Sequence, residues 1–467
     1  MPRRRSVQVW KVFPKMTIMD TAPSNSISFR DALRFWLKLG FIGFGGPAGQ
    51  IAIMHRELVE QKHWISERRF LHALNYCMVL PGPEAQQLAT YIGWLMHGTW
   101  GGIVAGGLFV LPSLFILIAL SWIYIAFGSV PLIAGVLYGF KPAVTAIVVA
   151  AAWRIGGKTL KNAWLWAIAI AAFMAIFIGG IPFPAIILSA ALIGMVGGQI
   201  APKFFTAGGG HDSAALDSVD AIIGDATPTP PHALFRLSRL ASYLAAGLAL
   251  WLIAMALLVA HSGVDGALAQ MGWFFSKAAL LTFGGAYAVL PYVYQGAVEN
   301  FHWLSAQQMI DGLALGETTP GPLIMVVAFV GFIGGWNQAV LGPDALFLGA
   351  ALAAGVVTFF TFLPSFLFIL IGGPLVEATH GQMKFTAPLT AITAAVVGVI
   401  VSLAVFFAWH VWWPLASRDA PFDGYFDSFS LLLTIAAALA LMRYKLNVIA
   451  VIFACAGMGV VKTFLLH

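Results

Sequence analysis

The stretch Phe44-Gly45-Gly46-Pro47, followed along the chain by Pro81-Gly82-Pro83-Glu84, decides how this protein folds. Both stretches return in the second half, as Phe283-Gly284-Gly285 and as Pro320-Gly321-Pro322. Position 44 thus corresponds to 283 and position 81 to 320, so one constant offset of 239 residues aligns the two copies without a gap. The same offset aligns Lys38 with Lys277 and His63-Trp64 with His302-Trp303. This shared register indicates an internal duplication.

The composition indicates a protein that is embedded in a lipid bilayer. Of its 467 residues, 60% are hydrophobic and only 9% are charged, whereas a soluble domain carries about 25% charged residues. Long runs contain no Asp, Glu, Lys or Arg, namely 104–127, 162–202, 240–264, 318–343, 345–376 and 385–417. A helix that crosses a bilayer needs about 20 apolar residues. We therefore predict an all-α polytopic membrane protein.

The predicted elements repeat in the two halves. The first half has apolar segments that are interrupted by the two motifs, then full crossings: 31–53, 71–97, 103–127, 130–152 and 162–202, the last long enough for two. The second half repeats them after an additional helix at 240–260: 270–296, 312–336, 345–376, 386–409, 428–442 and 446–465. The expected domains are a flexible cytoplasmic N-terminus at 1–28, an N-terminal repeat at 29–202, a cytoplasmic linker at 203–238 and a C-terminal repeat at 239–467.

The charges of two equivalent loops predict that the halves are inverted. Loop 54–70 carries four basic residues, Arg56, Lys62, Arg68 and Arg69, whereas loop 293–309 carries none. By the positive-inside rule the first loop is cytoplasmic and the second is external. Inverted repeats are common in secondary transporters. The alternative is that the surface charge of the two loops merely drifted apart.

The basic clusters of the first half also predict re-entrant hairpins. Loop 54–70, the cluster Arg154 to Lys161 and Lys203 all lie on one side only if 31–53 and 71–97 enter the membrane and return. The additional helix 240–260 then supplies the odd crossing that inverts the second copy.

The motifs themselves suggest an anion site. Gly45 and Gly46 end one half-helix, and Pro47 and Pro83 suit the first turn of the next. The start of a helix exposes free N–H groups and the positive end of the helix dipole, which attract anions. Lys38 and Lys277 precede the two F-G-G motifs at equivalent positions, and a lysine inside an apolar segment is a functional candidate. The alternative is that the motifs only kink and pack helices.

Further polar residues beside the breaks complete the predicted substrate site. Glu84 or Glu317 is a candidate carrier of a coupling proton, and Thr318, Thr319 and Asn75 are candidate donors to an oxyanion. The whole predicted set is Lys38, Phe44, Gly45, Gly46, Pro47, Asn75, Pro81, Gly82, Pro83, Glu84, Lys277, Phe283, Gly284, Gly285, Glu317, Thr318, Thr319, Pro320, Gly321 and Pro322.

Signals for enzymes, metals and cofactors are missing from the sequence. It has no G-x-x-x-x-G-K-[ST] stretch for ATP, no H-E-x-x-H and no G-x-S-x-G. One histidine and one carboxylate, as in Glu60 with His63, do not fill the coordination sphere of a metal. We expect no catalytic residue, no metal, no cofactor and no nucleic-acid partner.

The motifs resemble those of the chromate ion transporter (CHR) family in its long, two-domain form, over about residues 30–465. The resemblance is carried by the stretches Leu39-Gly40-Phe41-Ile42-Gly43-Phe44-Gly45-Gly46-Pro47, Leu80-Pro81-Gly82-Pro83-Glu84-Ala85, Thr282-Phe283-Gly284-Gly285 and Thr319-Pro320-Gly321-Pro322-Leu323. It implies a multi-pass carrier of the cell inner membrane that exports chromate and confers chromate resistance, with sulfate as the closest physiological mimic. The second copy departs from the first, with Ala286 in place of Pro47 and Leu323 in place of Glu84.

Several alternatives remain open at this point. The chain is a chromate exporter, a transporter of sulfate or another oxyanion, a passive anion channel or, less favoured, a membrane-embedded enzyme. Flux against a gradient separates a carrier from a channel. The direction of transport, the coupling ion (a proton is one candidate) and assembly as a homodimer are not readable from the sequence.

Overall fold

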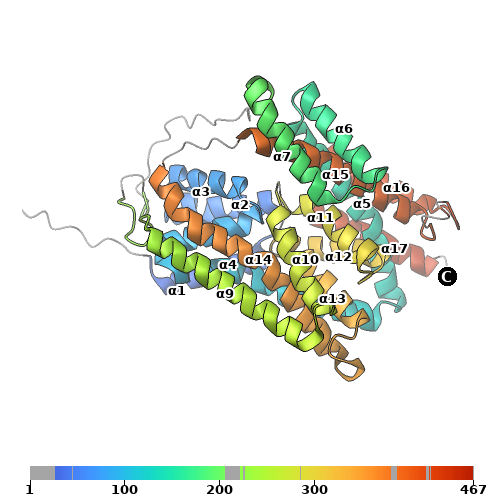
Figure 1. The fold of residues 1–467 in the computed structure, drawn as a ribbon. Coiled ribbons are helices and arrows are strands. Elements are labelled where there is room, and N and C mark those ends of the chain that lie inside the picture. The colour runs from blue at the N-terminus through green and yellow to red at the C-terminus, as the bar shows by residue number, and fades with distance from the viewer. Residues whose placement is uncertain are drawn as a thin grey trace, which may run out of the picture.

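The computed structural model describes residues 27–44, 46–205, 221–224, 227–283, 285–379, 386–416, 420 and 422–465. Most of these residues form helices (Figure 1). Most of the segment predicted at 1–28 and the middle of the predicted linker, 206–220, lie outside the described residues.

The helices of the first half follow the predicted order. They are α1 (Phe29–Ile42), α2 (Gly46–His55), the π-helix η1 (Arg56–Gln61), α3 (Glu67–Val79), α4 (Glu84–Phe127), α5 (Pro131–Thr159), α6 (Ala163–Phe177), α7 (Phe183–Ile200) and the short α8 (Pro202–Phe205). The additional helix is α9 (Leu237–Ser262).

The second half repeats this order after α9. It contains α10 (Ala267–Leu281), α11 (Ala286–Tyr294), the π-helix η2 (Gln295–Asn300), α12 (Ala306–Thr318), η3 (Leu323–Met325), α13 (Val326–Asn337), η4 (Pro343–Ala345), α14 (Leu346–Thr379), α15 (Thr386–Trp412), α16 (Ser428–Met442) and α17 (Val448–Leu465).

The offset of 239 residues holds for local backbone detail as well as for sequence. The two π-helices begin and end at equivalent residues, and so do α3 and α12. His63 and His302, which follow the π-helices, both have a φ of +50°. Ser66 and Ser305 then cap α3 and α12 through their hydroxyl groups. The halves therefore share local backbone detail from the π-helices through α3 and α12.

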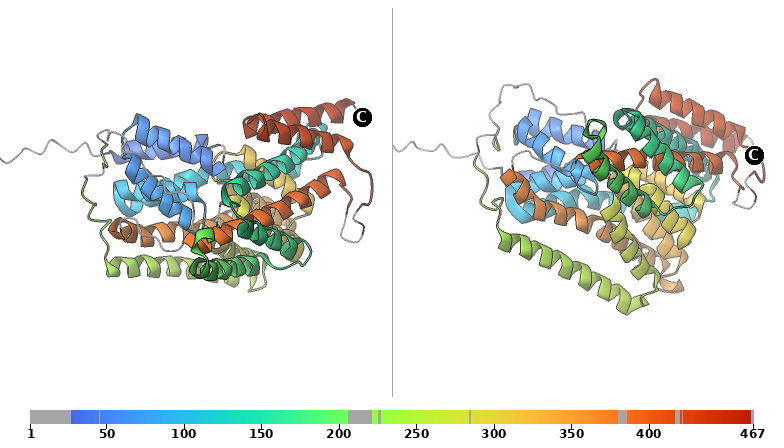
Figure 2. Two further views of the ribbon diagram at one scale, coloured as in Figure 1. Left: turned by 90° about the horizontal axis from the view of Figure 1, so that it is seen from above. Right: turned by 45° about the horizontal axis from the view of Figure 1, so that its top comes forward.

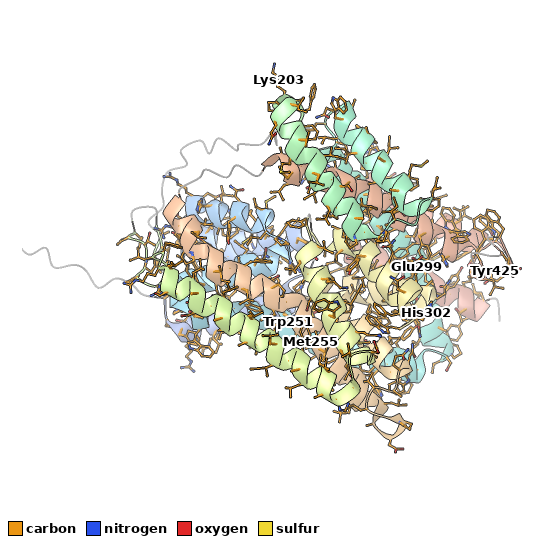
Figure 3. All side chains as sticks on the ribbon, viewed as in Figure 1. Lys203, Trp251, Met255, Glu299, His302 and Tyr425 are labelled. Atoms are coloured by element: carbon orange, nitrogen blue, oxygen red, sulfur yellow. The ribbon has the colours of Figure 1, made fainter. Side chains whose placement is uncertain are left out.

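Contacts between distant residues define two ends of the molecule. The ring of His97 lies 2.9 Å from the carbonyl oxygen of Ile27, and the N–H of Ser66 donates to the carbonyl of Ile223 at 3.1 Å. We call this end, which holds the start of α1, the turn before α3 and the described part of the linker, the linker end. The opposite end, which holds Glu299 and His302, is called the far end. In Figure 3 these two residues lie well apart from Lys203, which begins the predicted linker.

Both broken segments of the first half open at the linker end. α1 runs inward, and α2 with η1 returns to the turn before α3. α3 runs inward again, and α4 starts back from Glu84. α4 then folds over at His97 and Gly98, whose backbone angles are not helical, so that its first arm, 84–96, packs along its second arm, 99–127. Segments 31–53 and 71–97 thus each form a helical hairpin, as the predicted re-entrant arrangement requires.

The second half has the same two hairpins facing the other way. Asn337, which ends α13, donates through its side chain to the carbonyl of Trp303 at 2.9 Å, next to His302 at the far end. The second arm of α4 reaches the far end, where the ring of Trp122 lies 6.3 Å from that of Phe347 at the start of α14. The repeats are therefore inverted, and Figures 1 and 2 show the blue helices of the first half beside the yellow helices of the second.

Helix α9 supplies the crossing that inverts the second half. It starts at the linker end, where Tyr243 and Thr99 share a hydrogen bond of 2.6 Å. Farther along, the indole N–H of Trp251 donates to the hydroxyl of Ser276 on α10 at 2.8 Å, and Trp251 and Met255 are both labelled in Figure 3.

The last helices of each half pack on the other half. α5 packs against α16 and α17, α15 packs against α6 and α7, and α5 and α15 also touch each other. Gly135 and Gly139 of α5 lie directly against the backbone of α17. Small residues permit this close approach, which membrane helices use in place of a hydrophobic driving force.

Seven helices of the described part are long and apolar enough to cross a membrane, namely α4, α5, α7, α9, α14 with its 3-10 turn, α15 and α17. Three shorter apolar segments, Ala163–Phe177, Leu323–Asn337 and Ser428–Met442, accompany them. The chain is thus a multi-pass, all-helical membrane protein.

The inverted repeat predicts opposite labelling of two equivalent positions. Gln61 and Asn300 are both exposed and end the two π-helices. We expect Gln61→Cys to react with a membrane-impermeant maleimide only from the cytoplasmic side, and Asn300→Cys only from the outside. The native Cys77 and Cys455 are buried and give a low background. Labelling of both sites from one side would contradict the inversion.

Candidate functional site: the junction of the helix breaks

The breaks of the two halves are hydrogen-bonded to each other. The N–H of Gly82 donates to the carbonyl of Thr282 at 2.7 Å, and the N–H of Gly321 donates to the carbonyl of Gly43 at 2.9 Å. Gly82 and Gly321 are equivalent under the offset, and so are Gly43 and Thr282. Each P-G-P turn therefore rests on the F-G-G break of the other half, and the two bonds are a symmetric pair. We call these four breaks and the side chains between them the junction.

Glycine is required at the junction for two reasons. Gly46, Gly82, Gly285 and Gly321 have φ values of +67°, +126°, +93° and +105°, which residues with a side chain rarely adopt. In addition, a Cβ at Gly82 would lie 2.5 Å from the hydroxyl of Ser365, so this turn has no room for a larger residue.

A buried glutamine clamps one of the two contacts. Gln50, in α2, is 1% exposed. Its amide nitrogen donates to the carbonyl of Gly43 at 2.9 Å and also to the carbonyl of Gly321. Its amide oxygen has no hydrogen-bond partner within the described residues. The equivalent residue of the second half is Val289, so only one side of the junction has this clamp.

Two serines face the P-G-P turns across the boundary between the halves. Ser113 of α4 lies against Gly321, and Ser365 of α14 lies against Gly82. Both serines are 1% exposed, and neither hydroxyl has a partner within the described residues. By contrast, the hydroxyl of Thr361, one turn before Ser365, donates to the carbonyl of Val357 at 2.7 Å. A buried hydroxyl without a partner is costly, so these two serines are candidates for contact with a ligand.

The first arm of α4 adds two more buried amides. Gln86 and Gln87 are 0% exposed. Gln87 donates to the carbonyl of Pro81 at 2.8 Å, and Gln86 donates to the hydroxyl of Thr90 at 2.9 Å. The amide oxygens of both are without a partner in the described part of the chain. Two buried amide oxygens without a hydrogen-bond partner in the described part therefore lie in the first turn of the helix that follows the first P-G-P turn.

The two predicted carboxyl groups lie at the junction. Glu84 is the first residue of α4 and is half-buried. Glu317, near the end of α12, accepts a hydrogen bond of 2.5 Å from the hydroxyl of Tyr287 at the start of α11. This bond ties the end of one half-helix to the start of another beside the second P-G-P turn.

Three of the predicted oxyanion donors are not available. The hydroxyls of Thr318 and Thr319 both donate to the carbonyl of Leu315, at 2.9 and 2.6 Å, so their hydrogens are already used. Asn75 is exposed on α3. These contacts do not favour the three side chains as donors to a central anion, and their role stays a prediction.

The two lysines also lie away from the junction. Lys38 forms an ion pair with Glu57 at 2.9 Å and lines a separate pocket. Lys277 is exposed on α10 with its ammonium group 5.6 Å from the ring centre of Trp273. The two lysines are equivalent in sequence and both are exposed, and their contacts are with Glu57 and Trp273.

The remaining predicted residues form the turns themselves. Gly45 and Gly284 lie outside the described residues. The residues that flank them or build the P-G-P turns are half-buried or buried: Phe44, Pro47, Phe283, Pro81, Pro83, Pro320 and Pro322.

The serines were missed by the sequence analysis although the sequence contains a signal for them. Leu111-Pro112-Ser113 and Leu363-Pro364-Ser365 repeat in the two long crossings. Their separation differs from 239 because the connection between α13 and α14 is longer than the fold of α4 at Gly98. A comparison that tolerated one insertion would have found them.

The fold and the junction define a class of protein. Inverted repeats with discontinuous helices that meet at membrane depth are the architecture of a membrane transporter. The chain belongs to the chromate transporter family, whose family model, described as "Chromate transporter", matches residues 30–195 and 269–460. This membership supports a role in chromate transport.

Three relatives of the chain carry names that match this family. The chain is 35% identical to a "Chromate transport protein" of Pseudomonas aeruginosa over 82% of each chain. It is 30% identical to a "Chromate transport protein" of Cupriavidus metallidurans over 96% of each chain. It is 31% identical to a "Probable chromate transport protein" of Synechococcus elongatus over 81% of this chain and 84% of the relative. No solved structure matches it.

The glycine contacts predict unequal effects of two alanine substitutions. Gly82→Ala places a methyl group against Ser365 and Gln87, whereas Gly46→Ala meets no atom within 4 Å. Both variants bear the backbone strain of a positive φ, about 1–2 kcal/mol. We expect Gly82→Ala to lower the thermal unfolding temperature of the purified protein clearly more than Gly46→Ala. Equal losses would show that the glycines act through the backbone alone.

Proposed function

We propose that this chain is a secondary transporter that exports chromate across the inner membrane and thereby confers chromate resistance. Its membership of the chromate transporter family supports the substrate. The observation that carries the proposal is the pair of reciprocal hydrogen bonds, Gly82 to Thr282 and Gly321 to Gly43. Beside them lie the buried hydroxyls of two serines, which have no hydrogen-bond partner among the described residues.

The junction offers the donors that a tetrahedral dianion needs. The hydroxyls of Ser113 and Ser365 come from crossings of opposite halves, so an anion between them would contact both halves. The first turns of α2 and α4 add backbone N–H groups that have no partner within their own helix. A site of hydroxyls and N–H groups selects by size and charge and binds without covalent chemistry.

Alternating access follows from the symmetry of the two bonds. Rocking of one inverted repeat against the other would open the junction toward one end and then toward the other. The two cross-half bonds are equivalent, so each of the two open states would loosen one bond and keep its counterpart.

A proton is the coupling ion that the site favours. Glu84 and Glu317 both lie at the breaks, and carboxyl groups at membrane depth are typical proton carriers in transporters. The sequence contains no phosphate-binding loop for ATP, so an ion gradient is the natural energy source.

A flux measurement tests the transport activity. Inverted membrane vesicles with the protein should take up radiolabelled chromate against its gradient when a proton gradient is imposed, and vesicles without the protein should not. Sulfate and molybdate should compete because they are tetrahedral dianions, whereas nitrate should not. Uptake that only equilibrates chromate would indicate a channel, and strong competition by nitrate would contradict the dianion site.

The serines give a sharper test of the site. Ser113→Ala and Ser365→Ala each remove one donor to a charged oxygen, so we expect the KM for chromate to rise about tenfold or more. Thr361→Val is the matched control, because it removes a buried hydroxyl of α14 that is bonded within its own helix. Chromate transport with an unchanged KM in both serine variants would move the site away from the junction.

A further inference from the structure

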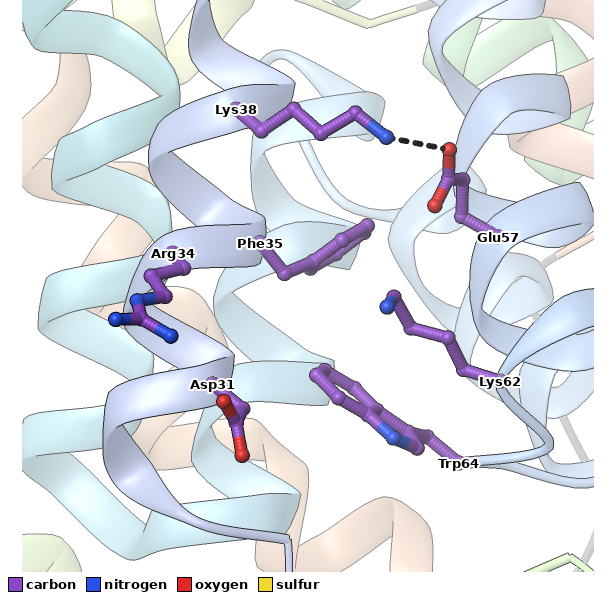
Figure 4. A pocket seen from close by; sticks show the side chains of 7 residues that line it. All are labelled: Asp31, Arg34, Phe35, Lys38, Glu57, Lys62 and Trp64. Carbon is purple, nitrogen blue, oxygen red and sulfur yellow. Dashed lines mark hydrogen bonds and ion pairs between the residues drawn. The ribbon is translucent and has the colours of Figure 1, made fainter.

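A charged pocket separate from the junction lies between α1 and η1. Its volume is about 290 Å³, and three cationic side chains line it: Arg34, Lys38 and Lys62. Figure 4 shows Lys38 and Glu57 joined across one side of it, with Lys62 and Trp64 reaching toward α1 from the chain that follows η1.

The carboxylates that line this pocket are already engaged. Glu57 pairs with Lys38 at 2.9 Å, and Asp31 accepts a hydrogen bond of 2.6 Å from the hydroxyl of Ser28. Neither Arg34 nor Lys62 has a carboxylate within ion-pair distance among the residues that the structure describes, and Lys62 instead lies 5.1 Å from the ring centre of Trp64. Three cations against two carboxylates leave the pocket with a cationic excess.

The second half shows that the fold does not require this pocket. The offset replaces Lys62 by Phe301, Arg34 by Trp273 and Glu57 by Gly296. There the ring of Phe301 stacks on Trp303 with centroids 4.6 Å apart, and it meets Phe274 at 5.8 Å. The same backbone thus builds a filled aromatic cluster in one copy and an open cationic pocket in the other, so the fold itself does not require these charges.

The surroundings of the pocket indicate what occupies it. Every fourth residue on the outer face of α1 is a large exposed apolar one: Phe29 at 45%, Leu33 at 39%, Leu37 at 44% and Phe41 at 50%. This stripe runs alongside Arg34, which follows Leu33 directly in the sequence. A soluble oxyanion has no use for such a stripe, whereas the acyl chain of a lipid lies along it while the phosphate reaches the cations.

We propose that this pocket binds the phosphate headgroup of an anionic phospholipid. Arg34 and Lys62 hold the phosphate, and Lys38 joins them from its pair with Glu57. Trp64 sits at the level of the headgroup, as tryptophan does at membrane interfaces. The proposal is independent of the transport cycle, because binding is measured on the purified protein without flux.

Native mass spectrometry with phosphatidylglycerol tests the proposal. The wild-type protein in neutral detergent should retain phosphatidylglycerol in preference to phosphatidylcholine. Arg34→Gln with Lys62→Gln should weaken that binding about tenfold or more. The matched control is Arg68→Gln with Lys158→Gln, which removes two exposed charges that do not line the pocket and should change nothing. Equal weakening in the control would show that only overall charge matters and would overturn the proposal.

One further variant and one displacement measurement complete the test. Lys62→Phe introduces the aromatic residue that the second half uses at this position, so it should abolish lipid retention while the thermal unfolding temperature stays near that of wild type. Displacement of the lipid by millimolar inorganic phosphate or chromate would instead identify a site for a free oxyanion, and would overturn the lipid assignment.

Discussion

Two backbone hydrogen bonds, from Gly82 to Thr282 and from Gly321 to Gly43, determine how this molecule is put together. Each joins a P-G-P turn of one half to the F-G-G break of the other, so neither half completes its own breaks. A broken helix in a bilayer leaves N–H and C=O groups that water cannot reach, and each unpaired group costs several kcal/mol, of order 2–7. The inverted arrangement removes this cost by letting each half supply the partners that the other lacks. The glycines are needed because the chain approaches closely and turns with a positive φ at these points.

The duplicated scaffold carries unequal chemistry on its two sides. At the junction, Gln50, Glu84 and Gln86 of the first half are matched by Val289, Leu323 and Met325 of the second. At the surface, the cationic pocket beside η1 is matched by the stacked rings of Phe301 and Trp303. In the proposed transport cycle the backbone symmetry would give the halves two equivalent ways to move, whereas the side chains make the two ends different.

Much of this architecture could be predicted from the sequence, because it rests on local rules. The duplication, the breaks, the hairpins and the role of α9 follow from register, glycine and proline chemistry and the placement of basic residues. The side chains of the site could not be predicted in the same way. Lys38 and Lys277 looked functional since charge is rare in apolar helices, but the face they occupy is set by packing between helices. Ser113 and Ser365 looked ordinary, and only the three-dimensional crossing of α4 and α14 brings them against Gly321 and Gly82.

A cryo-electron microscopy structure of the protein with bound chromate tests the central claim most directly. The account predicts tetrahedral density at the junction, in contact with the hydroxyls of Ser113 and Ser365, and P-G-P turns that touch the F-G-G breaks of the opposite half. Chromate density beside Lys38 or Lys277 with an empty junction would contradict it, as would breaks that close within their own half.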